Sequence, residues 1–344
     1  MFSPAFLLSL SLLSTTVVAD HIYSATYLPS NVPAQTEDGQ SGTNQCGTAL
    51  NQSSLCQTVY MNSLTDWCFW APPEPGPNSN IGDTEQIEVA WCTKNGTGAR
   101  LIPDGAIQGA HWLITPDYIQ VTGIGDMTLV NVPLHDTGGG GELDPHGADG
   151  NGNPVGGIVF SDAFGGTVQE IFEWTNFMGP GEFCFRICNP KGSNPAGYCQ
   201  HIYDEMGCDW NMPGNYGPGF DTCHADSGEA PGVYGGSTFH QGDGATPAPH
   251  PAPNPTACTT VSTISNGFII NGTNIALPTA TSSASGSAIT SPASASGSHS
   301  GSGSGASQTN SPSSAVASIQ SWERTVVSVG AAVVFSLVGA AVVL

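Results

Sequence analysis

The segment ELDPHGADGNGNP, residues 142–154, places oxygen and imidazole ligands close together in a glycine-rich stretch. Hard oxygen donors at alternating positions are typical of calcium sites. The candidate ligands are Asp144, His146, Asp149, Asn151 and Asn153. The segment departs from an EF-hand, because Pro154 replaces the tight-turn glycine and Phe160 replaces the closing glutamate. Two interpretations remain, a calcium loop and a solvated loop of Asx turns, and the pattern favours the second.

Glu170 and Glu173 are candidates for the paired carboxylates of a glycoside hydrolase. They lie in TVQEIFEW, residues 167–174, which has the pattern of a strand. An odd separation along a strand sends two side chains to opposite faces, so the pair is a poor acid and base couple. A hydrolase would need a further carboxylate from a distant part of the chain.

Histidines offer two other kinds of site. His201, Asp204 and Glu205 would converge as a base or ligand group on a helical turn, but Cys199 and Cys208 enclose them, which favours the bracing of a disulfide loop. A copper-dependent polysaccharide oxidase needs a histidine at the mature N-terminus. His21 meets this need only if cleavage follows Asp20, with His111 as a second ligand, and an aspartate at the −1 position disfavours that cleavage.

Zinc-protease and serine-esterase motifs are missing, since the folded region has neither HExxH nor G-x-S-x-G. Tryptophans provide the remaining recognition chemistry, because sugar rings stack on flat aromatic faces. The glycan-stacking candidates are Trp67, Trp70, Trp91, Trp112, Trp174 and Trp210. The alternative is that most of them cover disulfides and the core, especially Trp67 and Trp70 beside Cys68.

The elements that position these residues follow from composition. The chain has 344 residues, 27 acidic and 5 basic side chains, and a formal net charge of −22, which disfavours nucleic acid as a partner on almost every face. The 45 glycines and 26 prolines interrupt most stretches that could form long helices. We therefore expect an all-β, loop-rich, disulfide-stabilised fold with a disordered C-terminal stalk.

Strand patterns recur at short intervals, separated by turn residues. They are EQIEVAWC, YIQV, MTLVNV, GGIVF, TVQEIFEW and GEFCFRIC. In EQIEVAWC, Ile87, Val89 and Trp91 share one face. This spacing predicts an antiparallel sandwich or barrel-like core of roughly 200 residues. The one helical turn expected covers residues 200–206.

Ten cysteines in the ectodomain indicate five disulfides, because their number is even and their spacing lacks the paired steps of zinc ribbons. They are Cys46, Cys56, Cys68, Cys92, Cys184, Cys188, Cys199, Cys208, Cys223 and Cys258. Cys184 and Cys188 stand about 13 Å apart on one strand face, so they should reach different partners. Cys258 is either a strap across the domain or the free or intermolecular exception.

The two ends of the chain predict its location. Residues 6–13 form a short apolar core, and Val17 and Ala19 suit a signal-peptidase site, so we expect a signal peptide over residues 1–19. Residues 325–344 are uncharged, long enough to span a bilayer, and have no basic residue after them. This layout predicts a GPI-addition signal over residues 314–344, with Ser313 as the attachment site. The alternative is a single-pass membrane span.

Between these ends we expect an ectodomain over residues 20–245 and a Pro-rich connector with the Cys258 strap over residues 246–278. Residues 279–313 are nearly all small or polar and predict a disordered, O-glycosylated stalk. N-glycosylation is expected at Asn51, Asn95 and Asn271, which lie in sequons.

The blocks LDPHGADGNGNPVGGIVFSDAF, FCFRICNP and YCQHIYDEMGCDWNMPGNYGPGFDTCHADSGEAPGVYG are similar to fungal secreted glycoproteins named macrophage-activating glycoprotein. The resemblance covers roughly residues 20–260. It implies a secreted or surface-attached fungal protein with a Ser/Thr-rich tail, and it implies no catalytic residues.

Together these features predict a GPI-anchored glycoprotein on the extracellular face of the plasma membrane or in the cell wall. Its expected role is structural or in interactions, without catalysis and with no cofactor apart from the calcium interpretation. Cell-wall polysaccharide or other surface glycans are the expected partners, and the membrane is contacted only through the anchor. The alternative is a carbohydrate-active protein, either a glycan-binding module or a glycoside hydrolase.

Overall fold

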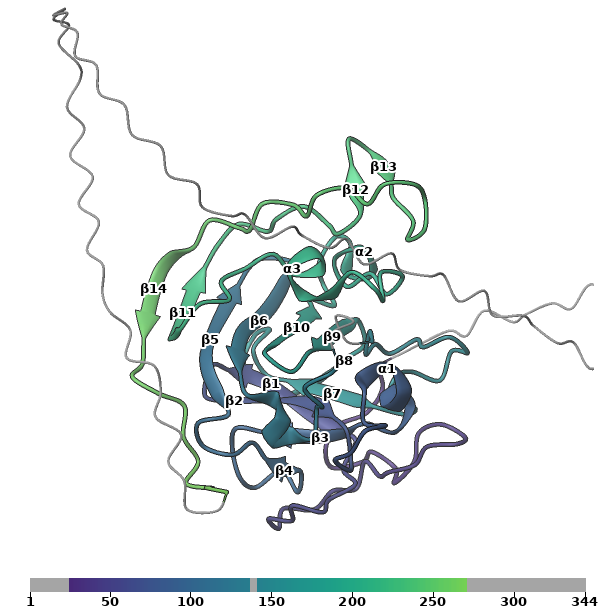
Figure 1. Cartoon of the computed structure of the whole chain (residues 1–344), viewed down its shortest axis with the longest axis vertical. Coiled ribbons are helices and arrows are strands. Elements are labelled where there is room, and N and C mark those ends of the chain that lie inside the picture. Colours follow the sequence, from purple (N-terminus) through teal and green to yellow (C-terminus); the bar gives the residue numbers. More distant parts are fainter. Residues whose placement is uncertain (1–24, 137–140, 271–344) are drawn as a thin grey trace, which may run out of the picture. The chain divides into compact units, whose positions relative to one another are not determined.

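Two six-stranded sheets form a sandwich in the computed structural model, which describes residues 25–136 and 141–270 (Figure 1). The first sheet has the order β4-β3-β2-β1-β7-β8 and the second the order β14-β11-β5-β6-β10-β9. The predicted all-β, disulfide-stabilised fold is therefore confirmed. The pairing is mixed, because β1 and β7, β3 and β4, and β5 and β11 run parallel, whereas the sequence pattern predicted an antiparallel sandwich.

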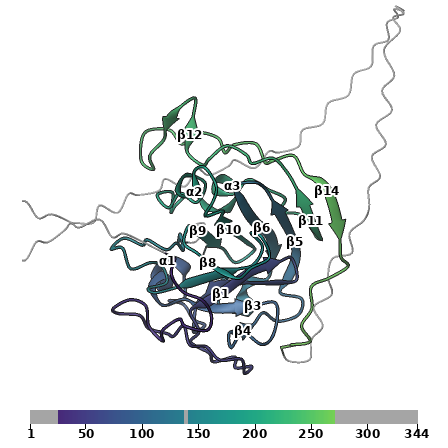
Figure 2. The same ribbon diagram turned by 180° about the vertical axis from the view of Figure 1, so that it is seen from behind.

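The strands of the first sheet are β1 (Thr58–Ser63), β2 (Asp66–Ala71), β3 (Val89–Cys92), β4 (Arg100–Leu101), β7 (Ile158–Ser161) and β8 (Gln169–Ile171). The strands of the second sheet are β5 (Ile107–Ile114), β6 (Tyr118–Gly125), β9 (Trp174–Met178), β10 (Glu182–Cys188), β11 (Gly219–His224) and β14 (Thr256–Thr260). A small hairpin adds β12 (Val233–Tyr234) and β13 (Ser237–Thr238). Seen from behind, the same two layers face each other across the domain (Figure 2).

Aromatic side chains fill the space between the sheets. Trp67 on β2 stacks on Phe183 of β10 with ring centroids 5.2 Å apart. Trp70 on β2 contacts Trp174 of β9 at 4.4 Å. Alternation along β10 supplies this packing, because Phe183, Phe185 and Ile187 share its inner face, as the pattern GEFCFRIC predicted.

Helices are short in the described residues. They are α1 (Ile81–Thr84), α2 (Pro195–Tyr198), α3 (Gly207–Asn211) and the 3-10 turns η1 (Glu85–Ile87) and η2 (Met127–Val130). The helical turn expected over residues 200–206 is wrong, since these residues form the link between α2 and α3. Figure 1 shows α2 and α3 on the same side of the second sheet as the β12–β13 hairpin.

Two segments predicted as strands are partly or wholly 3-10 turns. In MTLVNV, the side chain of Asp126 accepts a hydrogen bond from the backbone of Thr128, and Asn131 ends the turn at a φ of 75°. In EQIEVAWC only Val89–Cys92 is a strand, and Ile87 is 42% exposed instead of sharing the buried face. In MTLVNV, local capping by the Asp126 side chain outcompeted the apolar alternation.

All ten cysteines form disulfides. The pairs are Cys46–Cys56, Cys68–Cys92, Cys184–Cys208, Cys188–Cys199 and Cys223–Cys258. Cys184 and Cys188 thus reach different partners, as predicted. Cys258 is the strap rather than a free thiol.

The Cys258 strap lies within the predicted connector, residues 246–278, and is part of the packed structure. β14 pairs with β11 at the edge of the second sheet, where Figure 1 shows it outermost. Further along, the carboxylate of Asp104 accepts hydrogen bonds from Ser265, Asn266 and Gly267. Residues 256–268 are therefore held against the sandwich, rather than only linking the ectodomain to the stalk.

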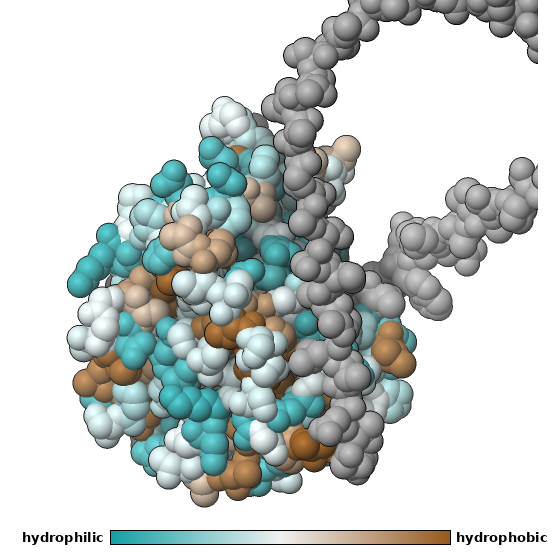
Figure 3. Space-filling model, turned by 90° about the vertical axis from the view of Figure 1, so that its left-hand side faces the viewer, coloured by the Kyte–Doolittle hydropathy of each residue, from teal (hydrophilic) through white to brown (hydrophobic). Residues whose placement is uncertain are grey.

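The face drawn in Figure 3 intersperses apolar residues among polar ones. The large apolar side chains with the greatest exposure in the described ranges are separate in sequence, and they include Leu134 at 77% and Leu50 at 50%. Single exposed apolar residues of this kind are normal for a protein surface. The pockets lined by polar groups are the more informative places to seek a site.

Candidate functional site

The loop over residues 142–157, which leads into β7, organises the candidate site. Asp144 Oδ1 accepts hydrogen bonds from the backbone N–H groups of His146, at 2.7 Å, and Gly147, at 2.9 Å. Asp149 Oδ1 accepts one from the backbone of Asn151 at 3.0 Å. These are the Asx turns that the sequence favoured.

The five predicted calcium ligands do not converge on one point, because Asn151 Nδ2 donates to Asp149 Oδ2 at 3.1 Å and two of the others contact different glutamates. Asn153 Nδ2 donates to Glu85 Oε2 at 2.8 Å, whereas His146 Nε2 lies 3.2 Å from Glu173 Oε2. Asp149 is exposed, while Asp144 is buried. Across residues 25–136 and 141–270, no group of three or more His, Cys, Asp or Glu side chains is arranged to hold a metal ion. Calcium binding by this loop stays a prediction.

Four acidic side chains, Glu85, Glu142, Asp144 and Asp204, form what we call the carboxyl cluster. They come from η1, the start of the 142–157 loop and the link between α2 and α3. Gly141 permits the approach of η1, because a Cβ there would collide with the Glu85 carboxylate. Glu142 is 1% exposed, and its carboxyl group lies beside the side chain of Asp204 and the backbone of Tyr203.

Burial raises the pKa values of three groups of the cluster, Glu85, Glu142 and Asp144. It raises the pKa of Glu142 well above the ordinary value, and the nearby carboxylates of Asp144 and Asp204 raise it further. Burial also raises the pKa of Asp144 to about 6, although two backbone N–H groups oppose the shift. The pKa of Glu85 is raised to about 7, first by burial and then by Asp204 and Asp144. Carboxyl groups that hold protons near neutral pH are suited to general acid catalysis.

Two histidines adjoin the cluster. The rings of His146 and His201 stack with centroids 4.0 Å apart. His201 Nδ1 lies 3.9 Å from Asp144 Oδ1. Burial lowers the pKa of His201, and the neighbouring His146 lowers it further. Neutral imidazole is therefore the favoured state of His201 beside these acids.

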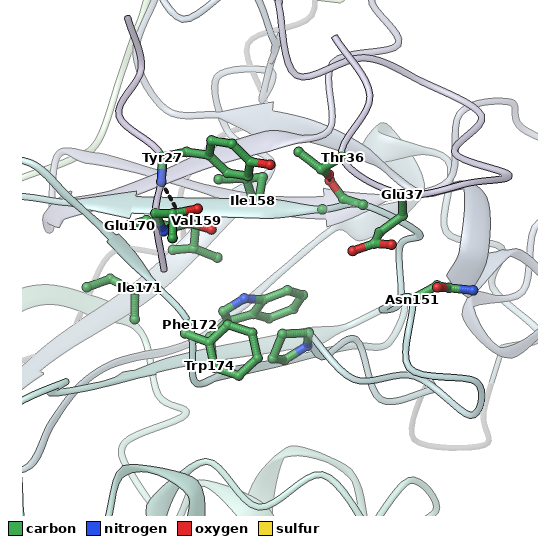
Figure 4. Close-up of a pocket in the computed structure, with 14 residues that line it drawn as sticks. Tyr27, Thr36, Glu37, Asn151, Ile158, Val159, Glu170, Ile171, Phe172 and Trp174 are labelled. Atoms are coloured by element: carbon green, nitrogen blue, oxygen red, sulfur yellow. Dashed lines mark hydrogen bonds between the residues drawn. The ribbon is translucent and has the colours of Figure 1, made fainter. Parts of the chain in front are cut away.

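A pocket of about 200 Å³ is lined in part by Pro145, Asn151 and Gly156 of the 142–157 loop. Figure 4 shows Glu37 and Glu170 on opposite sides of it, with the rings of Phe172 and Trp174 along another wall. Glu170 Oε2 accepts hydrogen bonds from the backbone N–H groups of Thr26, at 2.7 Å, and Tyr27, at 2.6 Å. Burial raises the pKa of Glu170 despite these two bonds.

Phe172 connects the pocket with the histidines beside the carboxyl cluster. It lines the pocket, and its ring meets the His146 ring edge-on with centroids 5.4 Å apart. Glu170 lines the pocket and Glu173 contacts His146, so the two glutamates have different surroundings, as predicted. The prediction that residues 167–174 form one continuous strand is wrong, since β8 ends at Ile171 and β9 begins at Trp174.

No family model matches the sequence, and no solved structure matches it. Two curated proteins of the fungus Mycosarcoma maydis do. Appressorium protein ROW2 is 47% identical over 250 residues, which are 71% of this chain and 85% of ROW2. The chain belongs to the ROW family of appressorium proteins. Appressorium protein ROW1 is 52% identical over 235 residues, 67% of this chain and 54% of ROW1, so the chain spans about half the length of ROW1.

The ROW relatives confirm that the chain comes from a fungal protein family, and neither carries the macrophage-activating name. Within residues 25–136 and 141–270, no helix is long and apolar enough to cross a membrane. The predicted signal peptide, the stalk, Asn271, Ser313 and the GPI-addition signal lie outside the described residues. Asn51 and Asn95 are exposed in loops, where a glycan could be attached.

The tryptophans of this ROW-family chain are core residues. All six candidates are at most 6% exposed. Stacking of a glycan on an exposed indole face is therefore not available at Trp67, Trp70, Trp91, Trp112 or Trp210, because the rings pack between sheets or under loops. Trp174 lines the pocket of Figure 4, but it is 1% exposed and packs against Trp70 and Phe185 in the core.

The copper interpretation also meets an obstacle. His111 is buried, with Nδ1 3.0 Å from Asp221 Oδ2 and Nε2 3.0 Å from the carbonyl oxygen of Gly217. Both ring nitrogens are engaged, so neither is presented to a metal. His21 lies outside the described residues.

Sequence reasoning thus found part of the site. His201 and Asp204 join the loop residues Asp144 and His146, whereas Glu205 is exposed and its backbone N–H bonds to Gln241. Glu85 was missed, because it lies in a segment that has the pattern of a strand. Glu37 was missed, because no spacing relates it to Glu170.

Proposed function

We propose that the chain is a GPI-anchored glycoprotein of the fungal cell surface or cell wall, and that its ectodomain acts by binding rather than by catalysis. Membership of a family of appressorium proteins is the observation that carries this proposal. Five disulfides fit an oxidising, extracytoplasmic compartment. The exposed sequons at Asn51 and Asn95 fit passage through the secretory pathway.

The proposed partner is a cell-wall polysaccharide. The net charge of −22 opposes binding to nucleic acid and to anionic lipid surfaces, which leaves neutral or cationic polymers. The pocket of Figure 4 combines carboxylates, an amide and aromatic rings, the groups that orient sugars through hydroxyl hydrogen bonds and ring contacts. Contact with the membrane is proposed through the lipid anchor alone.

Two assays test this function. Phosphatidylinositol-specific phospholipase C applied to intact cells should release the full-length mature protein into the medium. The released protein, incubated with insoluble chitin, chitosan, glucan or mannan, should be retained on at least one polymer without generating soluble oligosaccharides. Protein that stays on the cells after lipase treatment contradicts the anchor, and protein retained by none of the polymers contradicts the binding role.

A glycoside hydrolase is the second candidate, and the carboxyl cluster is the observation that favours it. Glu85, with a pKa of about 7 and partial exposure, has the properties of a general acid. Oligosaccharides released by the protein but not by Glu85→Gln would support this function. Release that Glu85→Gln leaves unchanged would assign the cleavage to another group or to a contaminant.

A further inference from the structure

The pocket of Figure 4 is acidic and has no basic side chain in its lining. Glu37 reaches it from the N-terminal segment, and Glu170 reaches it from β8. The chain as a whole strengthens the negative potential of the pocket, because it has 27 acidic side chains and only 5 basic ones. A ligand with a positive charge is therefore attracted to the domain and stabilised between the two carboxylates.

The remaining lining is that of a sugar site. The half-buried ring of Phe172 offers apolar surface, and Thr36 and Asn151 offer a hydroxyl and an amide, whereas Trp174 is 1% exposed and forms part of the wall behind them. The pocket volume of about 200 Å³ suits one small ring rather than an extended chain. Pyranose rings present apolar C–H groups on their faces and hydroxyl groups around their edges, which matches this combination.

We propose that this pocket binds a glucosamine unit with a free amine, as found in deacetylated chitin, and that the ammonium group lies between Glu37 and Glu170. The inference rests on the proposed binding function and names its ligand. N-acetylglucosamine has a neutral amide at the same position, so it forms no ion pair and adds a bulky acetyl group. A lysine side chain shares the ammonium group but lacks the sugar ring that Phe172 would contact.

The contacts also predict unequal roles for the two glutamates. Glu170 is already held by two backbone N–H groups at Oε2, so its position is fixed by Thr26 and Tyr27 before any ligand arrives. Glu37 lies in the segment between Thr36, whose hydroxyl donates to the carbonyl oxygen of Gly156, and the exposed Asp38. Glu37 can therefore be neutralised without removing the bonds that hold Glu170.

The test is a calorimetric titration of the secreted, full-length mature protein with glucosamine tetramer, N-acetylglucosamine tetramer and a lysine tetrapeptide. We expect binding of the glucosamine tetramer at least about tenfold tighter than that of the other two, equivalent to about 1.4 kcal/mol. Glu37→Gln should weaken glucosamine binding by about tenfold, because one charge-assisted hydrogen bond is lost. Asp38→Asn removes the same charge from the next residue, outside the pocket, and should leave the affinity unchanged.

Glu170→Gln gives a second variant, and its melting temperature shows whether the fold is retained. Equal weakening by Asp38→Asn and Glu37→Gln would overturn the pocket assignment, because only overall charge would matter. Preference for the acetylated tetramer or the lysine peptide would overturn the ligand assignment. Retention on chitin or glucan without glucosamine binding would overturn this inference but not the binding function, whereas cleavage of the tetramer would overturn the non-catalytic function alone.

Discussion

Replacing Asp144 with asparagine should remove a pH dependence that the carboxyl cluster builds into the fold. Asp144 is 3% exposed, and burial raises its pKa from 3.8 to about 6. A carboxyl whose pKa is higher in the folded than in the unfolded state stabilises the fold fully below its unfolded value, near pH 4. That contribution is lost as the pH rises through about 6.

The raised pKa of Asp144 corresponds to about 3 kcal/mol of unfolding free energy, lost between roughly pH 4 and pH 7. Glu85 adds to the loss with the same sign as the pH approaches about 7, but by less than its pKa implies, because solvent screens this partly exposed group. The amide that replaces the carboxyl group does not ionise, and its oxygen can still accept the bonds from His146 and Gly147. Asp144→Asn should therefore match the wild type at pH 4 and exceed it by up to about 3 kcal/mol at pH 7.

Urea unfolding at several pH values between 4 and 7, with linear extrapolation to water, measures this difference. Asp149→Asn is the matched control, because Asp149 is an exposed carboxylate in the same loop. Its pH profile should follow that of the wild type. A wild type that gains stability from pH 4 to pH 7 relative to Asp144→Asn would refute the reasoning, as would identical profiles for the two proteins.

Three further predictions concern calcium, the strap and the sequons. Millimolar calcium or EDTA should leave the melting temperature unchanged, because Asp144 and Asp149 already accept backbone hydrogen bonds; a rise with calcium would restore the metal interpretation. Cys223→Ser combined with Cys258→Ser should lower the free energy of unfolding in urea by about 2–4 kcal/mol and speed amide hydrogen exchange in β14. Unchanged protection of the β14 amides would contradict the role of this disulfide in holding β14 against β11. Peptide N-glycosidase should increase the electrophoretic mobility of the secreted protein, and loss of both exposed sequons should reduce that shift; an unchanged shift would contradict glycosylation at Asn51 and Asn95.

Strands with regular alternation were predictable, and segments with strong local capping were not. GEFCFRIC folds as β10 because its apolar positions meet the opposite sheet at every second residue. MTLVNV is equally apolar but becomes a turn, because the Asp126 side chain captures a backbone N–H group. The number of disulfides followed from composition, whereas the individual pairs depend on which segments the fold brings side by side, as in Cys68–Cys92 between β2 and β3 and Cys223–Cys258 between β11 and β14.

The candidate site was predictable only where its residues are close in sequence. The Asx turns of the 142–157 loop depend on contacts between neighbours, so composition indicates them. The approach of Glu85 to Asp144 and Asp204 depends on packing between segments far apart in the sequence, as does the pairing of His146 with Glu173. A raised pKa is a property of such packing, so it leaves no mark in the spacing of residues.

Peptide mapping of the mature protein, purified from its native cell surface without reduction, tests the central claim of an oxidised ectodomain tethered by lipid. The account predicts a first peptide that begins at Asp20, five disulfides in the pairs described, and a last peptide that ends at Ser313 with a glycolipid attached. A mature chain that retains residues 325–344 and carries free thiols would contradict it.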